Sequence, residues 1–96
     1  MKPVTIDIIT KNIVGWVYDF KNDYDCLPNS LDDLSEKKAE KHSYNPKRVF
    51  QLNQKLGFDA EYKILDDGSF EVLVYGSGKL MRYLSRSDEY LLRDKP

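Results

Sequence analysis

The feature that most constrains the fold is an apolar series in the first quarter of the chain. Apolar residues recur there at steps of three and four positions, at Ile6, Ile9, Ile13, Val17, Phe20 and Tyr24. This spacing places them along one face of an α-helix, which turns once in about 3.6 residues. The sequence therefore predicts a long N-terminal helix over residues 4–25 that buries one face against the rest of the domain.

The start of this segment also fits a second interpretation. Residues 4–9 are mostly β-branched and partly alternating, which suits a short strand followed by a helix capped at Thr10. We favour the single helix because the apolar stripe stays in phase through both halves. Pro3 also suits a first helical turn, where a missing N–H costs nothing.

A proline junction follows the predicted helix. Leu27 precedes Pro28 and is pushed away from helical angles, so the long helix is expected to end before it. Ser30 and Asp33 then have the spacing of a capping box, with Asp in place of the preferred Glu, and predict a short second helix over 31–40. The segment 49–56 is of uncertain type, and Gly57 is expected to stop it.

The last third of the chain predicts a β-meander. Three β-prone runs at about 60–66, 69–76 and 79–85 are separated by Asp67-Gly68 and by Gly76-Ser77-Gly78. Asp-Gly between two such runs is a strong hairpin signal. Alternation in the second run puts Phe70, Val72 and Val74 on one face, and Glu71, Leu73 and Tyr75 on the other.

These segments define one small α+β domain over residues 1–96. We expect a long N-terminal helix packed on a three-stranded antiparallel β-meander, with a short second helix between them, because three strands need a cover to be stable. The polar segment 85–96 has no assigned strand, although Tyr90, Leu91 and Leu92 are able to dock on the sheet.

The charge balance argues against nucleic-acid and membrane partners, which leaves protein partners as the expectation. With 15 basic and 16 acidic residues the formal net charge is −1, which gives no general attraction to nucleic acids or to anionic membranes. No apolar run approaches the length of a membrane span, so the chain as written is expected to be soluble, without direct membrane contact. Cys26 is the single cysteine, so no internal disulfide forms, and we expect it to be a small buried hydrophobe.

No pattern for catalysis or metal binding emerges. His42 lies in a Lys- and Glu-rich stretch and is expected at the surface, and one Cys and one His are too few for a zinc site. The turn at Gly76-Ser77-Gly78-Lys79 lacks the spacing of a phosphate loop. Acidic pairs offer oxygen ligands for calcium but lack the D-x-[DN]-x-[DN]-G series, and they occur at Asp66-Asp67 and Asp88-Glu89. We therefore predict no enzyme and no cofactor, with calcium as the one open alternative.

Several segments resemble the soluble part of type II secretion pseudopilins and related type IV pilin-like proteins. These segments are Phe20–Pro28, the following Asn29–Leu34, Gly57–Ile64 and Asp66–Lys79. In that family the long helix ends in an aromatic residue, a polar turn and a proline before a P-x-S-L-x-x-L segment, and a C-terminal hairpin follows. The resemblance implies a helix packed on an antiparallel sheet, and a subunit of a secretion or pilus-like filament of the cell envelope or periplasm. Proteins of that family begin with a peptidase cleavage site and an apolar helix that anchors them. Neither stands before Met1 in this sequence, so the resemblance implies a soluble domain that lacks the anchor.

Two other classes of function remain open at this point. A stand-alone cytosolic binding protein, such as an immunity or inhibitor protein, fits the small size and the seven tyrosines. A small hydrolase or nuclease would need paired carboxylates, but Asp32-Asp33 and Asp66-Asp67 are better explained as helix caps and turn formers. For an interface we predict exposed aromatic residues beside basic groups, namely Tyr44, Arg48, Tyr83, Arg86 and Tyr90.

Overall fold

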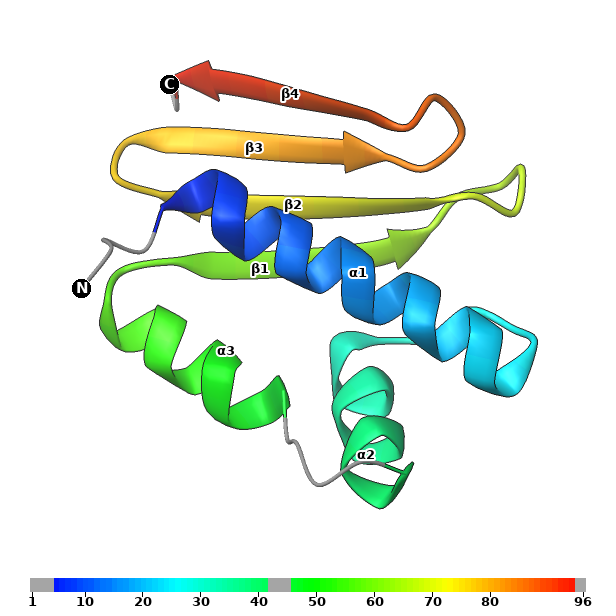
Figure 1. Cartoon of the computed structure of the whole chain (residues 1–96). Helices are drawn as coiled ribbons and strands as arrows, with labels where there is room; N and C mark the ends of the chain where they lie inside the picture. Colours follow the sequence, from blue (N-terminus) through cyan, green and yellow to red (C-terminus); the bar gives the residue numbers. More distant parts are fainter. Residues whose placement is uncertain (1–4, 42–45, 95–96) are drawn as a thin grey trace.

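Three helices precede an antiparallel sheet in the computed structural model, which describes residues 5–41 and 46–94. The helices are α1 (Ile6–Tyr24), α2 (Leu31–Lys41) and α3 (Pro46–Lys55). The strands are β1 (Asp59–Ile64), β2 (Phe70–Gly76), β3 (Lys79–Leu84) and β4 (Glu89–Asp94), in the spatial order β1-β2-β3-β4. Helix α1 lies across β2 and β3 on one face of the sheet, and α2 and α3 lie towards the β1 edge (Figure 1). The predicted α+β class is confirmed.

Helix α1 is one continuous helix, as the apolar stripe predicts. It begins at Ile6, so the alternative of a strand followed by a cap at Thr10 is wrong. Thr10 is fully buried inside the helix, where its hydroxyl donates a hydrogen bond to the Ile6 carbonyl at 2.7 Å. The helix ends before the proline junction, with Asp25 in the left-handed region at φ 59° and its N–H bonded to the Lys21 carbonyl.

Helix α2 starts in the predicted capping box. The Asp33 N–H donates to Ser30 Oγ at 3.0 Å, and the Asp33 carboxylate accepts a hydrogen bond from the Asn29 N–H at 3.1 Å. These bonds satisfy backbone donors that a helix start leaves without partners. Leu34, in the first turn after the cap, is fully buried in the core.

The segment of uncertain type is helical, since α3 covers most of 49–56 and stops before Gly57. Trp16 of α1 meets Phe50 of α3 edge-on, with ring centroids 5.6 Å apart. Phe58, directly after the stop, turns back into the core. The aromatic contact therefore holds α3 against α1.

The sheet has four strands, so the prediction of a three-stranded meander is wrong in its strand number. The three predicted strands are present, and β4 pairs with β3 from Lys79↔Asp94 to Leu84↔Glu89. The residues of β4 are exposed along its whole length. Its sequence does not alternate between apolar and polar residues, which is the pattern that marks a half-buried strand. The turn before it also has Asp88 at φ 52°, where a glycine would have signalled a hairpin.

The hairpin between β1 and β2 forms where Asp67-Gly68 predicts it. Gly68 has φ 86°, in the left-handed region that glycine adopts without strain, and its N–H bonds to the Leu65 carbonyl at 3.0 Å. The Asp67 carboxylate accepts a hydrogen bond from the Ser69 N–H at 2.9 Å. The Asp67 side chain therefore stabilises the turn in which it lies.

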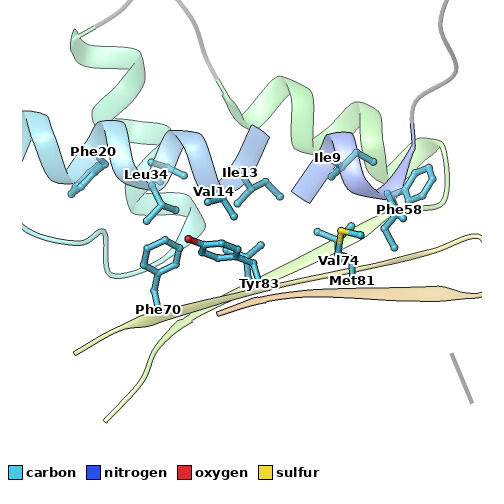
Figure 2. Close-up of a cluster of buried hydrophobic side chains, with 13 residues drawn as sticks. Ile9, Ile13, Val14, Phe20, Leu34, Phe58, Phe70, Val74, Met81 and Tyr83 are labelled. Atoms are coloured by element: carbon cyan, nitrogen blue, oxygen red, sulfur yellow. The ribbon is translucent and has the colours of Figure 1, made fainter. Parts of the chain in front are cut away.

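The core lies between α1 and the helix-facing side of β2 and β3 (Figure 2). The predicted alternation in β2 is correct, because its three even-numbered apolar residues enter this core. The buried residues of the core are Ile6, Ile9, Ile13, Val14, Val17, Phe20, Leu34, Phe58, Phe70, Val72, Val74, Met81 and Tyr83.

The opposite face of the sheet has no helix over it in the described residues, yet it is not simply solvated. Glu71 on this face is only 3% exposed. Its carboxylate accepts a hydrogen bond from Arg82 Nε at 2.6 Å and lies 3.7 Å from Lys63 Nζ. The two cations flank the carboxylate and compensate its burial.

The buried stripe yields a matched test on a single helix. Ile13 is 1% exposed and Ile8 is 43% exposed, although both are isoleucines of α1. We expect Ile13→Ala to lower the free energy of unfolding by about 2–4 kcal/mol through lost burial and a cavity. Ile8→Ala should change it by less than about 1 kcal/mol. Urea unfolding measures both, and equal losses would contradict the packing of α1.

Two glycines make a test with opposite signs. A Cβ at Gly76 would lie 2.1 Å from a carbon of the Phe58 ring, whereas a Cβ at Gly15 meets nothing within 4 Å. Gly76→Ala should therefore destabilise the domain by about 1–3 kcal/mol through overpacking. Gly15→Ala should stabilise it by about 0.5–1 kcal/mol, because alanine favours the helix interior. Thermal unfolding of both variants measures these two changes in stability. Destabilisation by Gly15→Ala would contradict the open space around Gly15 on α1.

Candidate functional site

The predicted interface residues do not form one surface. Tyr44 lies outside the described residues, as does His42. Arg48 is exposed on α3, towards the β1 edge, whereas Tyr90 is on β4 at the opposite edge of the sheet (Figure 1). Arg86 is exposed in the turn before β4, 3.9 Å from the Asp67 carboxylate.

Tyr83 is fully buried, so the prediction that it is exposed is wrong. It pairs with Val72 in the centre of the sheet, on the face that α1 covers. Its hydroxyl donates to the Asp88 carboxylate at 2.6 Å and lies 2.6 Å from the Tyr18 hydroxyl. Since Tyr83 gives its one proton to Asp88, Tyr18 is the donor in the second bond.

This hydroxyl cluster joins three parts of the fold. Tyr18 comes from α1, Tyr83 from β3, and Asp88 from the turn that leads into β4. The Tyr83 ring also lies against the Tyr90 ring of β4, with centroids 4.7 Å apart. Burial, and then the hydrogen bond to Asp88, raises the pKa of the Tyr83 hydroxyl, which therefore stays protonated as a donor. The cluster fixes β4 to the domain.

A partly exposed apolar surface lies above this cluster. We define the α1–β4 surface by five residues on the helix side of the sheet: Ile8, Lys11, Tyr18, Tyr90 and Leu92. The three α1 residues share one side of the helix through their spacing, and Lys11 Nζ is 5.8 Å from the centre of the Tyr90 ring. The apolar members are between 36% and 51% exposed.

The α1–β4 surface has the composition of a protein contact. Large apolar and aromatic side chains are typical of interface cores, and a charged residue such as Lys11 fits the polar rim around such a core. Sequence reasoning missed Ile8, Lys11 and Tyr18, because they lie on a helix whose apolar stripe draws attention to the opposite face. The available signal was the helical period itself, which places Ile8 and Tyr18 on the side of the helix away from the apolar stripe.

Two grooves lie towards β1, at the edge of the sheet away from β4. One, of about 310 Å³, is lined by residues of three helices and β1, among them apolar residues such as Ile9 and Phe50 and polar ones such as Asn53. The other, of about 380 Å³, runs along β1 beside the start of α2. In the second groove Lys63 and Glu71 form an ion pair with each other at 3.7 Å, and we assign no chemistry to either groove.

Residues that sequence reasoning weighed for chemistry have separate places in the fold. Cys26 is exposed after α1, so the expectation of a buried cysteine is wrong. Asp66 and Asp67 lie in the first hairpin turn, and Asp88 is bonded to Tyr83. Within residues 5–41 and 46–94, no group of three or more His, Cys, Asp or Glu side chains is placed to hold a metal ion. The calcium alternative gains no ligand set from these residues.

Comparisons with protein-family models, with curated proteins and with solved structures found no match to this chain. Among the described helices, none has the combination of length and apolar content that crossing a bilayer requires.

Tyr62, which is partly buried, and Tyr83, which is fully buried, predict a loss of stability at alkaline pH. Burial, and then the charge of Asp33, raises the pKa of Tyr62 to about 12, and its hydroxyl donates to the Pro28 carbonyl at 2.7 Å. An unfolded tyrosine ionises near pH 10, so the folded state holds this proton more tightly. Its stabilising contribution is complete below about pH 10 and is lost as the pH rises to about 12.

Denaturant unfolding across this range measures the effect. Tyr62→Phe and Tyr83→Phe should each flatten the fall in unfolding free energy above pH 10, and lower stability at neutral pH by about 1 kcal/mol. A slope that neither substitution changes would contradict the protonated, hydrogen-bonded state of both hydroxyls.

Proposed function

We propose that this domain acts by binding other proteins, as the pilin-like or pseudopilin domain of a subunit in a cell-envelope secretion or pilus-like filament. In this role the domain performs no catalysis, and its partners are neighbouring subunits of the same assembly.

The observation that carries the proposal is the arrangement of α1. The helix buries one side across β2 and β3 and leaves Ile8 and Tyr18 exposed on another. The resemblance to pilin-like proteins implies a helix packed in this way on an antiparallel sheet. The junction at Pro28 and the capping box at Ser30 lie where the family's P-x-S-L-x-x-L segment is expected. Both features support the proposal.

The use of polar groups also favours contact over chemistry. Thr10 and Ser35 bond back to carbonyls of their own helices, and Glu71 is held by Arg82. Among the described residues, no buried side-chain nitrogen or oxygen lacks a hydrogen-bond partner. The polar interior is thus occupied in holding the fold, whereas large apolar side chains face solvent at the α1–β4 surface.

A second candidate is a stand-alone cytosolic binding protein of the immunity or inhibitor kind. The partly exposed Tyr90 favours it, because tyrosine is enriched among the residues that contribute most of the binding energy at protein interfaces. The two candidates use the same surface and differ in compartment and partner.

Crosslinking in the native host separates them. A photoreactive amino acid in place of Ile8, in the protein expressed from its own locus, should give adducts with filament subunits in the envelope fraction. The control has the same group at Asn22, which is also exposed on α1. Adducts with a cytosolic protein would support the second candidate and refute the first. Equal labelling from both positions, or none, would contradict both.

A charge at the same position tests the consequence. Ile8→Asp should abolish filament assembly or secretion while leaving the fold intact, because it places a carboxylate in an apolar contact. Asn22→Asp adds the same charge elsewhere on α1 and should have no effect. Normal assembly with Ile8→Asp would refute the role of this surface.

A further inference from the structure

The free edge of β4 determines which of its backbone groups are available. In an antiparallel pair, alternate residues exchange hydrogen bonds. The Ser85 N–H bonds to the Phe70 carbonyl at 3.0 Å, so every second residue of β3 counted back from Ser85 bonds to β2. The intervening β3 residues bond to β4, and they are Leu80, Arg82 and Leu84.

The partners of these three residues are Arg93, Leu91 and Glu89. The alternate residues of β4 therefore direct their N–H and C=O groups away from the sheet. These are Tyr90, Leu92 and Asp94. No strand or helix of the described chain covers this side of β4, which forms one border of the sheet in Figure 1.

The edge is not protected in the way that edges usually are. Proteins commonly block a free strand with a proline, a bulge or a central lysine. The centre of β4 is instead Tyr90-Leu91-Leu92, between 36% and 51% exposed, with a regular pairing to β3. A regular, apolar edge of this kind favours pairing with another strand.

The other edge is different. Tyr62 of β1 donates a hydrogen bond to the Pro28 carbonyl, and the groove along β1 is lined by Ser30, Leu31 and Asp32 from the start of α2. A strand approaching β1 would meet these residues. The two edges therefore differ in access, and β4 is the open one.

The sequence of β4 is complementary to itself in an antiparallel register. Pairing Tyr90 with Leu92 of a second copy aligns the outward backbone groups of both strands. The same register places Leu91 opposite Leu91 and each Glu89 opposite Arg93 of the other copy. Neither Glu89 nor Arg93 has an ion-pair partner within its own chain in the described residues. Sliding by two residues would put Leu91 opposite a charge, and sliding by one would misalign the hydrogen bonds.

We propose that two copies of this chain pair through β4 about a two-fold axis at Leu91, forming one continuous eight-stranded sheet with both α1 helices on the same face. The two charge pairs and the reciprocal backbone bonds select a second copy over an unrelated strand, because an isologous contact needs a self-complementary surface. This pairing depends only on β4 and neither requires nor excludes the filament role.

Sedimentation equilibrium over a range of concentrations tests the pairing. The mass should rise from 11.2 kDa for the single chain to about twice that value. Glu89→Arg or Arg93→Glu alone places like charges opposite each other twice and should weaken the dimer about tenfold. The double variant Glu89→Arg with Arg93→Glu should restore wild-type affinity. A chain that stays monomeric, or a dimer that the single substitutions leave unchanged, would overturn the proposal.

Crosslinking fixes the register. In a Cys26→Ser background, Leu91→Cys brings two thiols together at a pair without hydrogen bonds, where the Cβ atoms are about 4.5–5.5 Å apart. Mild oxidation should convert this variant to a covalent dimer. Ile64→Cys on β1 is the control, since Ile64 is 43% and Leu91 38% exposed. Faster crosslinking through Ile64→Cys, or capture of β4 by a strand of another protein with no dimer, would refute the pairing of two copies.

Discussion

The packing of the α1 stripe on β2 and β3 is the interaction on which the other parts of this domain depend. A four-stranded meander with one apolar face is not stable in water until that face is covered. The stripe supplies the cover with Ile13 and Val17 at its centre, against Val72 and Tyr83 of the sheet. Helices α2 and α3 extend the same core towards β1, through Leu34 and Phe50.

One helix cannot cover four strands, and this limit produces the candidate site. Strands in a sheet are about 4.8 Å apart, and a helix with its side chains is about 10 Å wide, so α1 covers the two central strands. On the β1 side, α2 and α3 fill the space that remains. On the β4 side no described element does so, and Tyr90 and Leu92 stay partly exposed. The exposed apolar residues therefore follow from the geometry of the cover.

Much of the fold was predictable from local patterns. The helical period marked α1, the Ser30–Asp33 spacing marked the start of α2, and Asp67-Gly68 marked the first hairpin. Strand β4 was not predicted, because it is an exposed edge strand without a one-sided apolar pattern and the turn before it contains no glycine. Tyr83 and Cys26 were assigned the wrong exposure, because burial depends on which elements lie above a residue, and no local pattern reports that for an isolated side chain.

The sequence by itself determined the α+β class, the order of the main elements and the faces of α1 and β2, because periods of 3.6 and 2 are properties of the backbone. The tertiary structure alone decided which strand became the open edge, which tyrosine was buried and which residues of β4 lie beside the exposed side of α1. These outcomes depend on contacts between segments far apart in the chain, such as Tyr18 with Tyr83. For that reason the candidate site became visible only when the helix was seen lying on the sheet.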